Sequence, residues 1–230
     1  MRIHGWQKSS FVDAPSKVVT TVFSGGCNMN CPYCHNKDLV KNHMKMDTIP
    51  TDEILKHLDK RKCMLDGICI SGGEPTLDKN LENFIDKVRE KGYHVKLDTN
   101  GYRPDVLEKL LKAGKLDYVA MDIKNSPGKY AETVGLKAID INKIKKSVDL
   151  IKNSGIDHEF RTTVIKEFHS IEDIHKIKEW LGEGETYSLQ QYNPNCDQII
   201  GGFSAHEKET LNEFKETLET HYKKVNVKGL

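Results

Sequence analysis

Residues 18–36, VVTTVFSGGCNMNCPYCHN, join a hydrophobic run to three closely spaced cysteines. The β-branched residues at 18–23 predict a buried strand. Cys27, Cys31 and Cys34 follow two glycines, and they are half of the six cysteines in the chain. Cysteines this concentrated indicate a metal or redox site more often than disulfides when the protein is cytosolic. We therefore expect a metal-binding loop at the C-terminal end of the first core strand.

The spacing Cys-x3-Cys-x2-Cys is compatible with more than one metal. Three thiolates can hold three irons of a cubane iron–sulfur cluster, which leaves the fourth iron open. A structural zinc with His35 as fourth ligand is an alternative, although a ligand directly after Cys34 is awkward for tetrahedral geometry. Three unconnected buried thiols are the remaining interpretation. The local pattern leaves these possibilities open.

Downstream of the cysteines, hydrophobic strand patterns alternate with amphipathic helix patterns. Further core strands are predicted at residues 67–71, 93–98, 118–123, 160–165 and 187–192. Such alternation predicts an α/β fold with a parallel sheet. A closed eight-unit barrel needs about 250 residues, so we expect a partial (β/α)6 TIM-like barrel that is open on one side. A flavodoxin-like doubly wound sheet is the structural alternative.

The division of the chain follows from the same pattern. We expect residues 1–230 to form a single domain, with a turn-containing lead-in at 1–16, the partial barrel at 17–192 and an extension at 193–230. The extension is expected to carry a last helix and a short strand near residues 225–227.

Composition excludes several classes of function. The chain has 35 Lys and Arg against 34 Asp and Glu, a formal charge of +1, so no basic excess indicates nucleic-acid or membrane binding. No apolar run approaches the roughly 20 residues of a membrane helix, and the N-terminus shows no secretion signal. With 30% charged and 37% hydrophobic residues, the chain is typical of a cytoplasmic enzyme.

Three polar motifs fall at predicted strand ends. They are GGEP at residues 72–75, DTNG at 98–101 and DIK at 122–124. Parallel α/β folds build their active sites at the C-terminal edge of the sheet. We therefore expect these motifs to meet the cysteine loop.

The charges in these motifs need partners. Asp98 and Asp122 end neighbouring strands and would repel each other unless a cation or a proton lies between them. Lys124 points to the same strand face as Asp122. Arg161 lies inside an otherwise buried strand and requires either an acidic partner or a bound anion.

Together these motifs resemble the radical S-adenosylmethionine (radical SAM) superfamily. The cysteine array with Tyr33, the GGE motif, and the CHN, DTNG and DIK sequences are similar to the activases of glycyl radical enzymes. The opening GWQKSSFVDAP at residues 5–15 resembles one branch, the activating proteins of anaerobic ribonucleoside-triphosphate reductase. The resemblance implies a barrel of the radical SAM type and one [4Fe-4S] cluster on Cys27, Cys31 and Cys34. It also implies S-adenosylmethionine on the open iron, cleaved reductively to a 5′-deoxyadenosyl radical.

The resemblance also implies roles for individual residues. No general acid or base is expected. A monovalent cation is implied near Asp98, Thr99 and Asp122. The family histidine that contacts the nucleoside is missing near Asn193, so Gln191 or Asn193 is expected to replace it. The implied contacts to S-adenosylmethionine are Tyr33, His35, Gly72, Gly73, Glu74, Asp98, Thr99, Lys124, Arg161, Gln191 and Asn193.

The predicted function is the transfer of a radical to a partner enzyme. The partner is expected to be a glycyl radical enzyme. The resemblance to one branch implies that this enzyme is anaerobic ribonucleoside-triphosphate reductase. Reduced flavodoxin or ferredoxin is the expected electron donor. A radical SAM enzyme for a small molecule and a non-catalytic metal-binding or electron-transfer module are the alternatives. Cys196 is either a reactive free thiol or an inert one.

Overall fold

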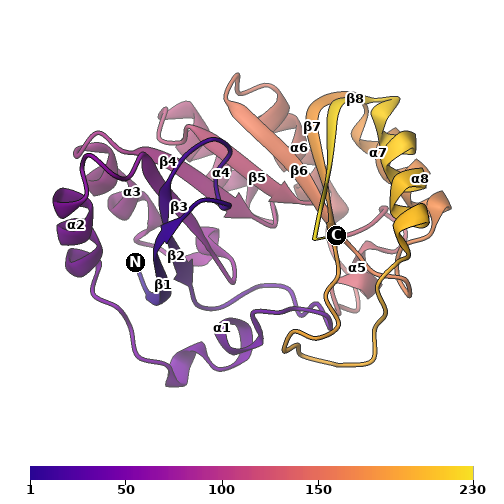
Figure 1. Cartoon of the computed structure of the whole chain (residues 1–230), viewed down its shortest axis with the longest axis horizontal. Helices are drawn as coiled ribbons and strands as arrows, with labels where there is room; N and C mark the ends of the chain where they lie inside the picture. Colours follow the sequence, from indigo (N-terminus) through magenta and orange to yellow (C-terminus); the bar gives the residue numbers. More distant parts are fainter. Residues whose placement is uncertain (230) are drawn as a thin grey trace.

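The computed structural model describes residues 1–229, which contain one eight-stranded sheet (Figure 1). The strands are paired in the order of the sequence, from β1 at one edge to β8 at the other. β1 and β2 are antiparallel, and every later pair is parallel. The strands are β1 Ile3–Ser10, β2 Val19–Ser24, β3 Gly67–Gly72, β4 His94–Thr99, β5 Tyr118–Asp122, β6 Asp157–Val164, β7 Gly184–Gln191 and β8 Tyr222–Lys228.

Helices cover the outer face of the curved sheet (Figure 1). Apolar side chains on alternate strand positions, such as Ile68, Ile70, Val95 and Leu97, are fully buried in this layer. No helix within residues 1–229 is both long and apolar enough to cross a membrane. The α-helices are α1 Lys37–Lys41, α2 Thr51–Lys60, α3 Leu81–Arg89, α4 Pro104–Lys112, α5 Tyr130–Thr133, α6 Ile141–Lys152, α7 Ile171–Leu181 and α8 Lys208–Glu219, and the 3-10 helices are η1 His43–Lys45 and η2 Pro75–Leu77.

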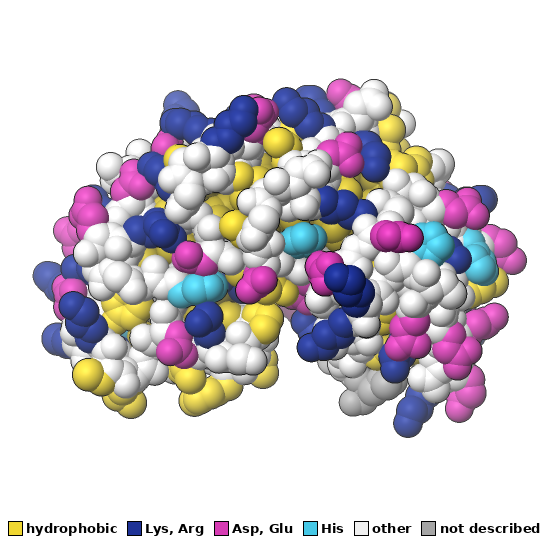
Figure 2. Space-filling view, turned by 90° about the horizontal axis from the view of Figure 1, so that it is seen from above, with side chains coloured by type: hydrophobic (Ala, Val, Ile, Leu, Met, Phe, Trp, Pro, Cys, Tyr) yellow, Lys and Arg dark blue, Asp and Glu magenta, His cyan; other side chains and the backbone are white. Residues whose placement is uncertain are grey.

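The sheet is a partial barrel, as predicted. β2 to β7 are the six expected core strands, and β8 adds a further parallel strand. β1 and β8 are the two edges of the sheet, and no pairing joins them in the described part of the chain. Seen from above, the surface is hollowed by a notch on one side, rimmed by charged side chains of both signs (Figure 2). The consecutive strand order excludes the doubly wound alternative, which reverses its strand order at a switch point.

β1 is an element that the sequence did not predict. Residues 1–16 were expected to be a lead-in with turn signals, but Ile3–Ser10 form a strand. Its pairing with β2 has two register irregularities. A side-chain hydrogen bond also joins the strands, because Trp6 Nε1 donates to Thr20 Oγ1 at 2.8 Å. Residues 3–10 therefore form a strand because they pair with β2, and not because they have a hydrophobic pattern of their own.

Helix starts were predicted with mixed success. Asp140 caps α6 by accepting a hydrogen bond from Asn142 N, and Ser170 forms a capping box with Asp173 at the start of α7. The sequence pattern of Ser204 and Glu207 predicts a capping box for the last helix, but this prediction is wrong, because α8 begins at Lys208 without a side-chain cap. Backbone N–H of Ser204 instead donates to the Glu167 carboxylate at 3.0 Å.

Candidate active site

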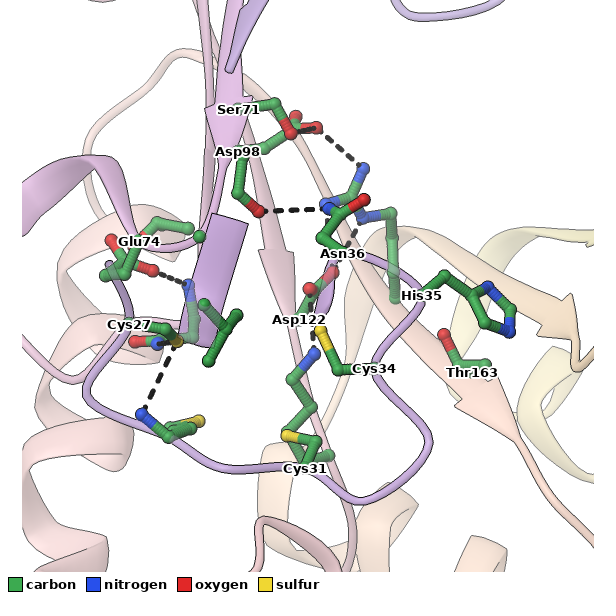
Figure 3. A pocket seen from close by; sticks show the side chains of 18 of the residues that line it. Cys27, Cys31, Cys34, His35, Asn36, Ser71, Glu74, Asp98, Asp122 and Thr163 are labelled. Carbon is green, nitrogen blue, oxygen red and sulfur yellow. Dashed lines mark hydrogen bonds and ion pairs between the residues drawn. The ribbon is translucent and has the colours of Figure 1, made fainter. Parts of the chain in front are cut away.

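A cavity of about 330 Å³ lies where the cysteine loop meets the C-terminal ends of the strands (Figure 3). Cys27 lies on the Glu74 side of the cavity, and Cys31 and Cys34 lie on the Asp122 side. The structure thus brings together residues as far apart in the sequence as Cys27 and Arg161. The predicted residues that line the cavity are Cys27, Cys31, Tyr33, Cys34, His35, Gly72, Gly73, Glu74, Asp98, Thr99, Asp122, Lys124 and Arg161.

The surroundings of Cys27 suit a thiolate ligand. Backbone N–H of Met29 donates to Cys27 Sγ at 3.4 Å, and Asn100 Nδ2 donates to the same sulfur at 3.8 Å. Asn100 Nδ2 also donates to Asn28 Oδ1 at 2.8 Å, which links the cysteine loop to the end of β4. Hydrogen bonds to sulfur are one means by which a protein tunes an iron–sulfur cluster.

Burial keeps these thiols protonated until a metal binds. Burial raises the pKa of Cys27 to about 12 and also raises the pKa of Cys31. Metal ligation must therefore displace protons from the thiols. Within residues 1–229, no three His, Cys, Asp or Glu side chains converge closely enough to hold a single metal ion. All three cysteines nevertheless line the same cavity, Cys27 on one side and Cys31 and Cys34 on the other.

The first side of the cysteine loop is bonded to the GGE motif. Gly73 N donates to Ser24 O at 2.9 Å, and Glu74 N donates to Gly26 O at 2.8 Å. A Cβ on Gly73 would lie 2.0 Å from Gly26 O, and one on Gly72 would lie 2.3 Å from Ser24 N. The glycines are therefore required for contact between two backbones, where the sequence had suggested close approach to a ligand.

The far side of the loop is supported by residues 125–139. Asn30 N donates to Val134 O at 2.9 Å. Gly135 has a φ of +66°, and a Cβ there would lie 2.3 Å from Asn30 O. On its outer side, Ile200 N donates to Pro32 O at 2.8 Å. The cysteine loop is thus held by three segments that are remote in sequence.

Glu74 connects β3 to β4 from a buried position. It is 1% exposed. Its Oε1 accepts hydrogen bonds from Thr76 and from Thr99 Oγ1 at 2.8 Å, and its Oε2 accepts from Asn100 N at 2.7 Å. Burial raises the pKa of Glu74, against these hydrogen bonds, which lower it. Within residues 1–229 all of its hydrogen-bond donors are neutral, so no cation is among them.

A network of ion pairs forms the opposite wall. Arg161 Nε donates to Asp122 Oδ1 at 2.9 Å, and its Nη1 donates to Asp98 Oδ2 at 3.3 Å. Lys124 Nζ donates to Asp122 Oδ2 at 3.0 Å. Asp122 pairs with Arg161 across β5 and β6, whereas Asp98 pairs with the small Ala120. The predicted need of Arg161 for an acidic partner is met by two aspartates.

This network changes the expected cation site. The positive charge between Asp98 and Asp122 is the guanidinium of Arg161. Burial opposes ionisation of Asp98, but Arg161 and Lys96 lower its pKa to about 2. Thr99 does not face the pair, because its hydroxyl donates to Glu74. A bound cation is therefore not needed to relieve the repulsion that the sequence predicts.

Tyr33 and His35 belong to a series of aromatic contacts. The Tyr33 ring lies 5.9 Å from Phe168, and Phe168 lies 5.2 Å from Phe203. His35 stacks on Tyr192 with ring centroids 5.5 Å apart. Burial lowers the pKa of His35. These contacts join the cysteine loop to the segment that follows β7.

Gln191 and Asn193 do not line the cavity. Gln191 Nε2 donates to His206 O at 2.6 Å, and Asn193 Oδ1 accepts from Asn195 N at 3.0 Å. Gln190 lines the cavity in their place. Successive side chains of a strand point to opposite faces of the sheet. An error of one residue in position therefore selects Gln191 instead of Gln190. Cys196 is exposed and lies outside the cavity.

Several polar residues of the cavity wall were not predicted from the sequence. The pairing of Thr163 with Gln190 across β6 and β7 shows why these two belong together. Strand alternation from Arg161 would have identified Thr163, and the DTNG and CHN motifs already contain two of the others. These residues are Asp13, Asn36, Ser71, Asn100, Thr163 and Gln190.

His169 holds the Lys124 backbone and supports a pH prediction. Its Nδ1 accepts from Ile165 N at 3.1 Å, so its Nε2 carries the hydrogen and donates to Lys124 O at 2.9 Å. Burial lowers the pKa of His169 to about 4. The unfolded value is about 6.5, so the stability that neutral His169 provides is present above that pH and is lost as pH falls towards 4. The loss amounts to about 3 kcal/mol at most.

Urea unfolding under anaerobic conditions at a series of pH values between 7 and 4 tests this expectation. His169→Gln should be less stable at pH 7 and should show a flatter pH dependence than the unmodified protein. An identical pH dependence in both proteins would assign the effect to other groups.

Comparisons with known proteins place this chain in a family. Residues 21–181 match the radical SAM superfamily model. A protein of Methanocaldococcus jannaschii that carries the provisional name of a glycyl-radical enzyme activating enzyme is 40% identical over 189 residues, which cover 80% of this chain and 77% of that protein. The pyruvate formate-lyase-activating enzyme of Clostridium pasteurianum is 32% identical over 186 residues, covering 76% of this chain and 74% of that enzyme.

The fold agrees with a solved structure at lower sequence similarity. Streptococcus suis SuiB bound to S-adenosylmethionine superposes with a TM-score of 0.69 at 17% identity, over 90% of this chain and 49% of SuiB. This chain therefore spans about half the length of SuiB, and the similarity concerns the fold alone.

The chain belongs to the radical SAM superfamily, whose members use a [4Fe-4S] cluster and S-adenosylmethionine. Within that class it is an enzyme of the glycyl-radical-enzyme activating type, the type named for its relatives. Family membership thus makes a [4Fe-4S] cluster, and not zinc, the cofactor of this chain.

Proposed function

We propose that this protein installs a glycyl radical on a partner enzyme. Cys27, Cys31 and Cys34 hold one [4Fe-4S] cluster, and S-adenosylmethionine occupies the cavity beside it. The cluster with S-adenosylmethionine supplies a 5′-deoxyadenosyl radical, which removes hydrogen from a glycine Cα of the partner. The chain itself contributes binding, orientation and exclusion of water.

The charge distribution of the cavity carries this proposal. On one wall, Lys124 and Arg161 are paired with Asp98 and Asp122, and Lys96 contacts Asp98 from behind this wall. The other wall has Glu74, whose hydrogen-bond donors are neutral. An amino acid zwitterion complements both walls, with its carboxylate towards the cations and its ammonium towards Glu74 and the glycines. The methionyl end of S-adenosylmethionine is such a zwitterion.

The remaining predicted contacts complete the binding site. Tyr33 and His35 hold the cysteine loop through their aromatic neighbours, and Tyr33 is proposed to offer its backbone to the adenine. Gln190 and Thr163, which line the cavity, are better placed to contact the nucleoside than Gln191 and Asn193. No side chain is required as a general acid or base.

Anaerobic ribonucleoside-triphosphate reductase is the proposed partner. The support is the resemblance of residues 5–15 to the activating proteins of that enzyme. The identity with the Clostridium pasteurianum enzyme favours pyruvate formate-lyase as a second candidate. Reduced flavodoxin or ferredoxin is the proposed electron donor, and the cytoplasm the proposed location.

Electron paramagnetic resonance tests the partner directly. The reduced protein with S-adenosylmethionine is incubated anaerobically with each of the two enzymes. We expect a glycyl radical signal on the reductase, and none when S-adenosylmethionine is omitted. A signal only on pyruvate formate-lyase would assign the second partner, and no signal on either would contradict both assignments.

Removal of Lys124 should weaken S-adenosylmethionine binding without loss of the cluster. Lys124→Ala removes one of the cations facing the ligand carboxylate, and the loss of one partner from a buried charge pair weakens binding by about thirtyfold or more. Arg161→Ala is expected to act in the same direction. Equilibrium dialysis measures the affinity, iron analysis measures the cluster, and the exposed Lys166→Ala serves as a matched control. Loss of iron in Lys124→Ala would instead indicate a structural role.

A further inference from the structure

Lys96 is a buried cation that lies outside all the sequence motifs of the site. It lies on β4 two residues before Asp98, so both side chains point into the barrel. The side chain is 2% exposed. Its Nζ contacts Asp98 Oδ1, Cys69 Sγ at 3.7 Å and the ring of Tyr118, whose centroid is 5.8 Å away. Because a lysine is almost never fully buried unless it is paired, Asp98 is the counter-ion that keeps Lys96 in this position.

Lys96 reaches Asp98 from behind the proposed cofactor site. A second cavity of about 1080 Å³ occupies the barrel interior on the other side, and Lys96 lines this cavity and not the first. Asp98 and Arg161 line both cavities and separate them. The ammonium of Lys96 therefore neutralises Asp98 without taking space from a ligand in the first cavity.

The oxygens of Asp98 are already supplied with donors. Oδ1 contacts Lys96, and Oδ2 accepts from Ser71 Oγ at 3.1 Å and from Arg161. Thr99, the next oxygen that a cation would need, is bonded to Glu74. An alkali cation requires several oxygen ligands at once. The ammonium of Lys96 carries the same single positive charge and does not require those additional oxygen ligands.

We propose that Lys96 is a built-in monovalent cation of this site. Its ammonium group supplies to Asp98 the single positive charge that Na⁺ or K⁺ would otherwise bring, and it keeps Asp98 paired with Arg161 in the arrangement that receives the carboxylate of S-adenosylmethionine. This inference rests on the proposed function. Its consequence is that S-adenosylmethionine binds without an alkali cation, and that removal of the lysine creates a requirement for one.

Salt exchange tests the inference on the anaerobic, cluster-containing protein. Equilibrium dialysis measures S-adenosylmethionine affinity in potassium chloride, sodium chloride and the chloride of bulky N-methylglucamine. For the unmodified protein the three dissociation constants should agree within about twofold. In N-methylglucamine, Lys96→Ala should bind about tenfold or more weakly, and K⁺ or ethylammonium should restore much of the affinity. Lys96→Arg should resemble the unmodified protein, as should Lys224→Met, which removes an exposed lysine from the same second cavity.

Thermal unfolding without S-adenosylmethionine provides an independent measurement. The midpoint of Lys96→Ala, or of Lys96→Met if the alanine variant does not fold, should fall and should rise again with K⁺ but not with N-methylglucamine. Alkali-dependent binding by the unmodified protein, or full affinity of Lys96→Ala in N-methylglucamine, would overturn the inference. An unmodified protein that binds no S-adenosylmethionine in any salt would refute the proposed function instead, and the unfolding measurement would still decide the role of Lys96.

Discussion

Replacement of Cys27, Cys31 or Cys34 by alanine is expected to abolish reductive cleavage of S-adenosylmethionine. Each cysteine lines the cavity. A [4Fe-4S] cluster held by only three protein ligands is not expected to tolerate the loss of one of them. Anaerobic purification followed by iron and sulfide analysis measures the cluster. Release of 5′-deoxyadenosine after reduction measures cleavage.

The chain offers matched controls for these variants. Cys63 and Cys196 are exposed and lie outside the cavity, so Cys63→Ala and Cys196→Ala should retain both cluster and cleavage. Retained turnover in any of the three cavity variants would contradict the assignment of the ligands.

Gly73→Ala should cause a comparable loss through the backbone. The added Cβ would lie 2.0 Å from Gly26 O, in the contact that holds the start of the cysteine loop against the end of β3. Backbone atoms cannot move aside as a flexible side chain can, so the loop must shift. We expect a loss of about 2 kcal/mol or more of stability and poor incorporation of the cluster. Gly135→Ala should act similarly from the other side, because its φ is positive and Asn30 O is 2.3 Å from the added Cβ.

Gly128→Ala is the matched control for both glycine variants. Nothing lies within 4 Å of a Cβ at this position, and its backbone is not in the left-handed region. It should therefore unfold and incorporate iron like the unmodified protein. Full cluster content in Gly73→Ala would show that the loop is not positioned by this backbone contact.

Local patterns predicted the part of the fold that depends on local chemistry. The β-branched run before Cys27 and the alternation of strands with amphipathic helices identified β2 to β7 within a few residues. Because the C-terminal ends of parallel strands share one edge, the convergence of the cysteine loop with Glu74, Asp98 and Asp122 followed from topology.

The features that the sequence did not predict depend on contacts between remote segments. β1 is stabilised by pairing with β2, and nothing in its own eight residues alternates clearly. Whether Gln190 or Gln191 points into the barrel depends on the register of β7. An error of one residue in that register reverses the answer. Lys96 precedes a recognised motif, yet its pairing with Asp98 becomes visible only when the burial of both is known.

The charge that lies between Asp98 and Asp122 also depends on contacts between remote segments. The sequence showed that Asp98 and Asp122 would repel, but it could not show which positive charge lies between them. Arg161 reaches both because Asp122 is its direct neighbour across the sheet and Ala120, beside Asp98, is small. The pairing of residues across neighbouring strands decides this, and the residues next to Asp98 and Asp122 in the sequence carry no signal of it.

Isotope transfer from the partner tests the central claim most directly. Anaerobic ribonucleoside-triphosphate reductase is prepared with glycine deuterated at Cα and incubated with the reduced protein and S-adenosylmethionine. Mass spectrometry of the 5′-deoxyadenosine should show one deuterium gained, in proportion to the glycyl radical formed. Unlabelled 5′-deoxyadenosine that accumulates without a glycyl radical would show cleavage of S-adenosylmethionine without hydrogen removal from this partner, and would contradict the account.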